Sequence, residues 1–191
     1  MAQQAVTLRP ATAADMAGVF EIHKHYTLKT VTTFKVDVTS EAEHLDKLKM
    51  VQSQHLPYIV AILPSSFEGG CEVRDCVIGY TYCSNFRGDK AGYLHTVELS
   101  LFCHPDHLYQ GVGTLLLNKV LEVMKAPDKN KEWIEGGMPR SEDSAVRQII
   151  ACMAIDETGK HDGYGLKMWY EKFGFEEVGH LKNVGYKLDR W

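Results

Sequence analysis

The sequence predicts a fold of the α+β class, built on a mixed sheet rather than on a doubly wound parallel one. Strand-like and helix-like patterns follow one another as strand, two helices, three strands, helix, strand, helix and strand. Strands that can pair as hairpins therefore precede strand–helix units, which indicates a mixed sheet. The 191 residues are 45% hydrophobic, enough for one sizeable core. We therefore expect a single domain over residues 1–191.

The first part of the chain is predicted to form one strand and two capped helices. Residues 6–9 alternate in hydrophobicity and form the strand. Thr12 and Asp15 have the spacing of a hydroxyl cap and its following acid, and apolar residues at helical spacing come after them. After a polar loop, Ser40 and Glu43 repeat this capping pattern at the start of the second helix.

The later elements are predicted from β-branched runs, helical spacing and glycine stops. Residues 64–75 contain Gly69-Gly70 and are expected to form a hairpin loop, and Gly174 is a natural helix stop. In chain order the elements are strands at 58–62, 77–83 and 94–103, a helix at 111–125, a surface insertion at about 127–146, a strand at 148–155, a helix at 164–173 and a strand at 175–186.

Composition and charge exclude several classes of protein. Lysine and arginine number 21 against 25 acidic residues, and the net charge of −4 argues against broad nucleic-acid binding. No run approaches the roughly 20 apolar residues that span a bilayer, and the N-terminus lacks a signal-peptide pattern. The five cysteines form no C-x-x-C pair and the nine histidines show no ligand spacing. We therefore expect reduced thiols, a cytoplasmic location, no membrane association and no metal site.

Residues 96–114 carry the most chemical information. A strand ends at Pro105, a short loop follows, and Gly111 and Gly113 stand at the mouth of the next helix. Glycines there let a ligand approach the backbone N–H groups closely, and the helix dipole favours an anion. Two glycines that merely ease a turn are the alternative.

These glycines, after the loop His104-Pro105-Asp106-His107, resemble the pyrophosphate-binding motif Q/R-x-x-G-x-G/A of the GCN5-related N-acetyltransferases. Leu108 stands where this family usually has Gln or Arg. A second motif, Tyr170-Glu171-Lys172-Phe173-Gly174-Phe175, resembles the Y-E-K-x-G-F helix end of the same family. Within it, the chain is most similar to phosphinothricin and methionine sulfoximine acetyltransferases, through residues 8–16, His25-Tyr26, Phe34, residues 78–82, Phe86-Arg87, Tyr93, Thr96-Val97-Glu98 and residues 184–187.

The resemblance implies a central twisted sheet with helices on both faces. It also implies that acetyl-CoA, the cosubstrate, lies in a splay between the two middle strands, where its pantetheine arm extends the strand edge. The implied pantetheine contacts are Leu101, Phe102 and Cys103. The implied pyrophosphate contacts are Tyr109, Gln110, Gly111, Val112, Gly113 and Thr114. Lys119 and Lys125 are candidates for the 3′-phosphate, or else members of a solvated helix face.

Acetyl transfer to an amine needs a base for the ammonium proton and an acid for the departing thiolate. Glu98 is the candidate base, because it lies within an apolar strand where burial would raise its pKa; a carboxylate on a solvated strand face is the alternative. The resemblance makes Tyr170 the candidate acid, with an aromatic packing residue as the alternative. Cys103 lacks an evident base nearby in sequence, so we do not expect a covalent acetyl-enzyme.

We therefore expect an acetyl-CoA-dependent N-acetyltransferase that works by direct transfer in a ternary complex. The implied acceptor is the primary amine of a small molecule, an L-amino acid or analogue of the phosphinothricin or methionine sulfoximine type. Its expected contacts are Phe34, Tyr82, Tyr186 and Lys187. The alternatives are another amine (a peptide N-terminus, a lysine, a polyamine or a drug) or a non-catalytic acyl-CoA-binding sensor.

The C-terminal segment also carries an expectation about assembly. In the resembled acetyltransferases the motif at residues 184–187 leads into one more strand, which would begin at Trp191. A sheet without that strand would expose backbone donors and acceptors. There are three explanations for such an edge: the chain is truncated, another segment covers the edge, or a second subunit covers it. We expect a homodimer whose interface includes part of residues 175–191.

Overall fold

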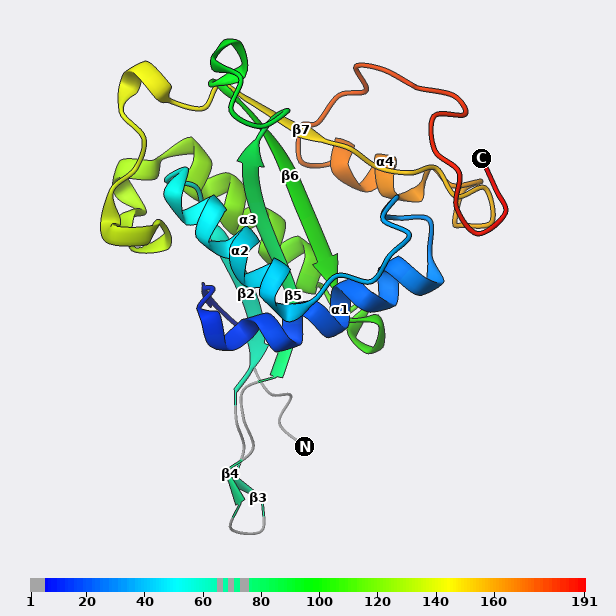
Figure 1. Cartoon of the computed structure of the whole chain (residues 1–191), viewed down its shortest axis with the longest axis horizontal. Coiled ribbons are helices and arrows are strands. Elements are labelled where there is room, and N and C mark those ends of the chain that lie inside the picture. The colour runs from blue at the N-terminus through cyan, green and yellow to red at the C-terminus, as the bar shows by residue number, and fades with distance from the viewer. Residues whose placement is uncertain (1–5, 65–66, 69–70, 73–75) are drawn as a thin grey trace. The chain divides into compact units, whose positions relative to one another are not determined.

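The computed structural model describes residues 6–64, 67–68, 71–72 and 76–191 (Figure 1). The chain forms two compact units by its internal contacts. The first unit contains residues 1–23 and 39–151, and the second contains residues 24–38 and 152–191. That one domain covers residues 1–191 stays a prediction.

A five-stranded sheet forms the centre of the first unit. Its strands lie in the order β1-β2-β5-β6-β7, and every neighbouring pair is antiparallel except β6 and β7, which are parallel. This arrangement confirms the mixed sheet and the α+β class. The bounds are Thr7–Pro10 for β1, Tyr58–Leu63 for β2, Cys76–Asn85 for β5, Thr96–Cys103 for β6 and Gln148–Ala151 for β7.

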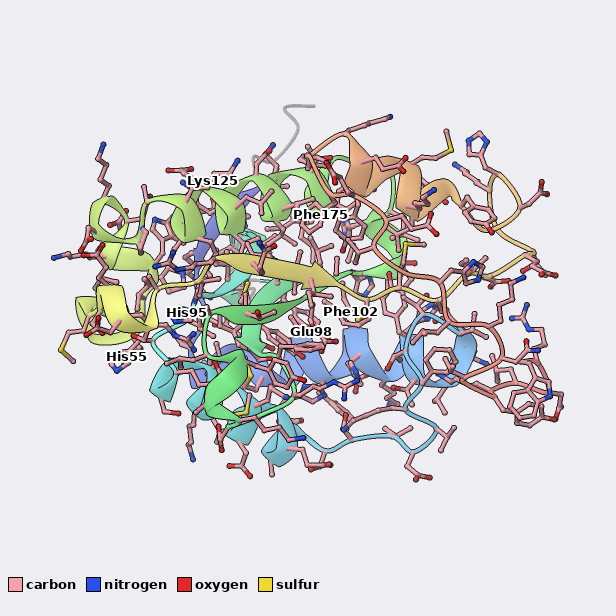
Figure 2. All side chains as sticks on the ribbon, turned by 90° about the horizontal axis from the view of Figure 1, so that it is seen from above. His55, His95, Glu98, Phe102, Lys125 and Phe175 are labelled. Atoms are coloured by element: carbon pink, nitrogen blue, oxygen red, sulfur yellow. The ribbon has the colours of Figure 1, made fainter. Side chains whose placement is uncertain are left out.

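Helices cover both faces of this sheet, as expected (Figure 2). The N-terminal part of α1 (Met16–Lys29) and α2 (Glu41–Ser53) lie on one face, and α3 (Val112–Lys125) lies on the other. A Cβ atom on Gly79 of β5 would lie 3.0 Å from side-chain carbons of Val112 and Leu116. The absence of a side chain at Gly79 therefore lets the beginning of α3 approach the sheet closely.

Both predicted helix starts are observed. The Asp15 carboxylate accepts hydrogen bonds from the Thr12 N–H at 2.7 Å and the Thr12 hydroxyl at 2.9 Å, and a short 3-10 turn (η1, Ala13–Asp15) leads into α1. At α2 the Glu43 carboxylate accepts from the Ser40 N–H at 2.8 Å, while the Ser40 hydroxyl accepts from the Glu43 N–H at 3.3 Å. At both starts the hydrogen bonds join residues three positions apart, as in a capping box.

The region between β2 and β5 and the insertion after α3 follow the predictions in outline. The short strands β3 (Phe67–Glu68) and β4 (Cys71–Glu72) pair as a hairpin, while Gly69 and Gly70 lie outside the described residues. Residues 127–146 form four 3-10 turns: η4 (Pro127–Lys129), η5 (Lys131–Trp133), η6 (Glu135–Gly137) and η7 (Glu142–Ser144). The insertion is largely exposed, but it contributes the buried side chain of Ile134 to the core.

Two strand predictions are wrong. The strand expected at 148–155 is the shorter β7, which is half-exposed rather than buried. Residues 175–186 form no strand in the structure, and Val178, Leu181 and Val184 are 90%, 78% and 67% exposed. A strand is stabilised by a hydrogen-bonded neighbour and a buried face, and the apolar residues of a segment do not by themselves supply either.

The second unit contains the end of α1 and the short helix α4 (Gly165–Glu171). The chain turns after it at Gly174, whose φ of +85° lies in the left-handed region, as expected for a glycine stop. Lys187 and Arg190 form an isolated antiparallel bridge, and the Arg190 guanidinium donates to Asp156 at 2.9 Å. In the described part of the chain, no helix is both long and apolar enough to cross a membrane.

Candidate active site

The edge of β6 that faces β7 is only partly paired. The parallel register of β6 and β7 ends where Leu99 meets Ala151, whereas β6 continues to Cys103. Among the described residues, positions 100–103 of β6 therefore have a strand partner only on the β5 side. An edge of this kind allows an extended ligand to form β-type hydrogen bonds with β6, as the predicted splay requires.

The start of α3 forms an open, N–H-rich mouth. Gly111 has a φ of +84° and caps the helix, and its carbonyl accepts the first helical hydrogen bond, from the Leu115 N–H at 3.0 Å. The N–H groups of Val112, Gly113 and Thr114 therefore have no acceptor within the helix. A Cβ atom on Gly111 would meet nothing within 4 Å. This open mouth, at the positive end of the helix dipole, suits a phosphate group.

The loop before this mouth is held by its own side chains. The Gln110 amide donates to the Asp106 carbonyl at 3.2 Å, and its oxygen lies 3.3 Å from Nδ1 of His107. The Gln110 side chain therefore stabilises the loop. Tyr109 has a left-handed φ of +61° and is exposed, as is Leu108. Backbone strain of this kind at a non-glycine residue is common where a loop is shaped for binding.

Glu98 lies on the α1/α2 face of the sheet together with Phe102 (Figure 2). The register pairs Ser84 with Glu98 and Tyr82 with Ser100, so Tyr82 shares this face. Burial raises the pKa of the Tyr82 phenol, the Glu98 carboxylate raises it further, and a hydrogen bond with Ser100 opposes both. Glu98 is half-buried. It is therefore neither enclosed in the core nor on a fully solvated strand face.

In the second unit, Tyr170 lies on α4 within an aromatic cluster. Its ring centroid is 4.9 Å from that of Trp169 and 5.1 Å from that of Phe175. The side chain is half-buried. These contacts agree with the packing alternative, and the role of general acid stays a prediction.

The second unit also brings together three of the expected acceptor contacts. Phe34 packs on the backbone at Gly185, and the Tyr186 hydroxyl donates to Asp189 at 3.2 Å. Lys187 is buried, and its ammonium group donates to main-chain carbonyls. Tyr82 belongs to the first unit, on β5.

The sequence profile of the acetyltransferase (GNAT) family matches residues 32–144, more than half of the chain. The chain belongs to the GNAT family. The match includes β6, the loop after it and the mouth of α3. The open mouth and the partly paired edge therefore lie in the part of the chain that identifies the family.

Individual relatives extend this result over nearly the whole chain. The phosphinothricin N-acetyltransferase of Streptomyces viridochromogenes is 28% identical over 186 residues, which cover 97% of this chain and 82% of the relative. The L-methionine sulfoximine/L-methionine sulfone acetyltransferase of Salmonella typhimurium is 23% identical over 97% of this chain and 89% of the relative. A GNAT phosphinothricin acetyltransferase from Sinorhizobium meliloti, solved in complex with AcCoA, superposes with a TM-score of 0.73 at 28% identity, over 97% of this chain and 83% of that one.

These findings confirm that the protein is an N-acetyltransferase and that acetyl-CoA is its acetyl donor. The observed geometry fits this donor. A pyrophosphate needs N–H donors with open space before them, as at Gly111, and a pantetheine arm needs a free strand edge, as at positions 100–103.

The Cys103 thiol is partly buried at the end of β6. Burial raises the pKa of its thiol to about 11. The thiolate, which is the nucleophilic form, is therefore a minute fraction of the population near pH 7. That no acetyl-enzyme forms stays a prediction.

The two lysines considered for the 3′-phosphate are differently placed. The Lys119 ammonium donates to Glu122 at 2.7 Å and lies 4.9 Å from the Trp133 ring centroid. Lys125 is at the last position of the 14-residue helix α3 (Figure 2). At 1.5 Å per residue, that is about 20 Å from the helix mouth. Lys125 is exposed and fits the alternative of a solvated helix face, whereas the Lys119 side chain is only 23% exposed and is paired with Glu122. A contact of either lysine with the 3′-phosphate stays a prediction.

A histidine pair near β6 was not predicted. The Thr39 hydroxyl lies 2.8 Å from Nε2 of the buried His44 and 3.4 Å from Nδ1 of His23, and the His23 ring is 5.6 Å from the Phe102 ring. No local signal connects His23 with His44, because their contact depends on how α1 and α2 pack.

Arg140, in the insertion, was also missed. Its guanidinium donates to the Gln54 carbonyl at 2.8 Å, to the Leu94 carbonyl at 3.0 Å and to the Asn85 side chain. It therefore fixes the loop between β5 and β6. A lone arginine in a polar insertion carries no sequence signal for such a role.

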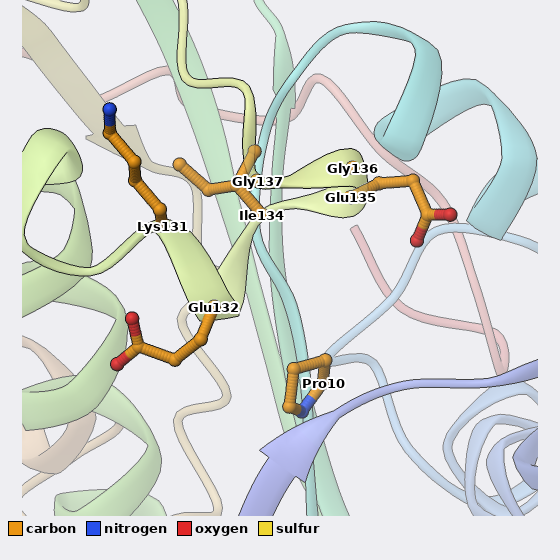
Figure 3. A pocket seen from close by; sticks show the side chains of 7 residues that line it. All are labelled: Pro10, Lys131, Glu132, Ile134, Glu135, Gly136 and Gly137. Carbon is orange, nitrogen blue, oxygen red and sulfur yellow. The ribbon is translucent and has the colours of Figure 1, made fainter.

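A cavity of about 320 Å³ lies beside the insertion (Figure 3). The side chains of Lys131, Glu132 and Glu135 point away from one another around it, and Glu135 accepts a hydrogen bond from Gln52 at 2.9 Å. Polar groups that do not converge are unlike a small-molecule site. Its remaining lining residues are Pro10, Ile134, Gly136 and Gly137.

Proposed function

We propose that this enzyme acetylates the primary amine of a small molecule, an L-amino acid or an amino-acid analogue, by direct transfer in a ternary complex. The proposal depends mainly on one observation: the partly paired edge and the Glu98 carboxylate both belong to β6. Its partly paired edge and the α3 mouth suit acetyl-CoA, while Glu98, on the same strand, offers a half-buried carboxylate. The relatives named for phosphinothricin and methionine sulfoximine support an acceptor of this type.

The chain's own groups would hold the donor at two places. The N–H groups of residues 109–114 would bind the pyrophosphate, and the backbone of residues 101–103 would bind the pantetheine arm. Acetyl-CoA supplies an acetyl group activated as a thioester. No side chain is needed to carry that group, in line with the raised pKa of the Cys103 thiol.

Glu98 would accept the proton that an amine must lose before it can attack. A free amine is mostly protonated at neutral pH, so a carboxylate that takes the proton directly or through a water raises the reactive fraction. The Tyr170 phenol would donate a proton to the departing sulfur. In this scheme Tyr82, with Phe34 and Tyr186, would contact the acceptor.

The proposal includes a cytoplasmic homodimer of single-domain subunits. Support for a covered C-terminal surface comes from the exposed apolar side chains of residues 175–191, where Val178 and Trp191 are 90% and 76% exposed. Apolar patches of this kind are commonly covered by a partner. A monomer in light scattering at micromolar concentration would exclude the dimer.

Release of free coenzyme A in the presence of a panel of amines tests the proposed activity. L-Phosphinothricin, L-methionine sulfoximine and L-methionine sulfone are the expected acceptors; a peptide N-terminus, a lysine side chain and a polyamine are the comparison set. If only amines of the comparison set are acetylated, the proposal of an amino-acid acceptor is wrong and the acceptor is the amine that reacts. Acetyl-CoA binding without thiol release above background for any amine would indicate a sensor.

A further inference from the structure

Lys187 carries a buried positive charge that connects the C-terminal segment of the second unit with residues 26–33. Its residue exposure is 4%, and its Nζ donates to the Thr33 carbonyl at 2.6 Å and to the Tyr26 carbonyl at 3.2 Å. Within the described residues no carboxylate pairs with it. A buried ammonium group is costly unless it is hydrogen-bonded, so these two carbonyls fix where residues 26–33 run relative to Lys187.

The position of the two carbonyl groups further stabilises the buried ammonium group. Tyr26 lies in the last turn of α1, which ends at Lys29. Carbonyl groups there carry the negative end of the helix dipole, and a cation beside them is stabilised. Thr33 lies in the loop that follows, next to Phe34. The ammonium group thus joins the end of α1 to the loop that carries Phe34.

A second contact holds the same loop two residues away from Lys187. A Cβ atom on Gly185 would lie 2.2 Å from Cε1 and 2.5 Å from Cδ1 of Phe34. Only glycine allows the Phe34 ring to pack on the backbone in this way. The ring is nevertheless 51% exposed, so part of it remains open to a ligand.

We propose that Gly185 and Lys187 form a clamp that positions Phe34, and that Lys187 acts on the acceptor through Phe34 rather than by touching it. This rests on the proposed function, in which Phe34 contacts the acceptor. The clamp makes Lys187 a positioning residue. In the proposed function the exposed part of the Phe34 ring would contact the methylene groups of the amino-acid side chain, not its α-amine.

A measurement that does not need activity tests the clamp. Lys35 is exposed and follows Phe34 by one residue, so trypsin cleavage after Lys35, followed by mass spectrometry, reports how firmly the loop is held. Lys187→Met keeps the length of the side chain and removes the charge, and cleavage after Lys35 should become at least about tenfold faster. Lys182→Met, at an exposed lysine of the same segment, is the matched control and should leave the rate unchanged.

Steady-state kinetics then test the route through Phe34. Lys187→Met and Phe34→Ala should each raise KM for the amine by about tenfold, with kcat and KM for acetyl-CoA within about twofold. The double variant should be no worse than Phe34→Ala alone. If Lys187→Met does not fold, Gly185→Ala displaces the ring without touching the ammonium group and should give the same pattern.

Unchanged cleavage after Lys35 in both the Lys187→Met and Gly185→Ala variants would overturn the clamp. Additive effects on KM in the double variant would overturn the positioning role, because they would show that Lys187 acts by a contact of its own. Faster cleavage with no acetylation of any amine would support the clamp and contradict the proposed function instead.

Discussion

Gly111→Val is the sharpest test of the acetyl-CoA site. Gly111 has a φ of +84° at the start of α3, and a side chain there would meet nothing within 4 Å in the protein. The substitution therefore causes no clash with the rest of the chain. It places a branched side chain where the pyrophosphate would lie, on a backbone conformation that L-residues rarely adopt.

The size of the effect follows from the groups at the helix mouth. A left-handed conformation costs an L-residue about 1–2 kcal/mol, so the variant should unfold more easily by roughly that amount. Hydrogen bonds to a charged group contribute about 1.5–3 kcal/mol each. If the valine prevents two of the N–H groups of Val112, Gly113 and Thr114 from reaching the phosphate, the affinity for coenzyme A falls by about 10²–10⁴-fold.

Isothermal titration calorimetry with coenzyme A measures this on the folded variant. Gly137→Val is the matched control, because Gly137 also has a positive φ of +64° and open space around its Cβ position but lies in the insertion. The control should lose a similar amount of stability and keep its affinity. A Gly111→Val variant that is folded and binds coenzyme A with unchanged Kd would refute the pyrophosphate site.

Three further substitutions test the remaining assignments. Glu98→Gln should lower kcat by about 10²–10⁴-fold at neutral pH with little change in acetyl-CoA affinity, and a near-normal kcat would exclude Glu98 as the base. Tyr170→Phe keeps the ring contacts, so it should leave the melting temperature unchanged while it slows turnover and shifts the alkaline limb of the pH–rate profile; an identical profile would favour packing alone. Asp15→Asn should destabilise the fold by about 3 kcal/mol at pH 7, because Arg9, which donates to Asp15 twice at 2.7 Å, would lose its charged partner.

The Asp15 prediction has a defined pH dependence. Burial alone would raise the pKa of this carboxyl, but hydrogen bonds from Arg9 and Thr12 outweigh it and hold the pKa below its ordinary value of 3.8. A group whose pKa is lower in the folded state stabilises the fold above its unfolded pKa, and this contribution is lost as the pH falls through the folded pKa. Urea unfolding of both proteins should therefore give a difference that is constant near neutrality and shrinks below about pH 4. A difference independent of pH would contradict the role of the charge.

The sequence by itself determined the features that depend on neighbouring residues. The capping pairs Thr12/Asp15 and Ser40/Glu43 act within one helical turn, and Gly111 forms the helix mouth through its own backbone. Motifs of this kind can be recognised from the order of the residues alone, because their energies come from groups a few residues apart. Together with the order of strand and helix patterns and the motif at residues 170–175, they indicate the mixed sheet, the family and the acetyl donor.

Tertiary structure decided what depends on partners far along the chain. Residues 175–186 were expected to form a strand but form none, because an apolar segment does not by itself supply a neighbouring strand. Lys187 was expected to contact the acceptor, yet its ammonium group donates to carbonyls 154 and 161 residues away. The contacts of Arg140 with Gln54 and of His23 with His44 likewise arise only when helices, loops and sheet have packed. Burial and long-range hydrogen bonding decide the role of such side chains, and both are properties of the folded chain.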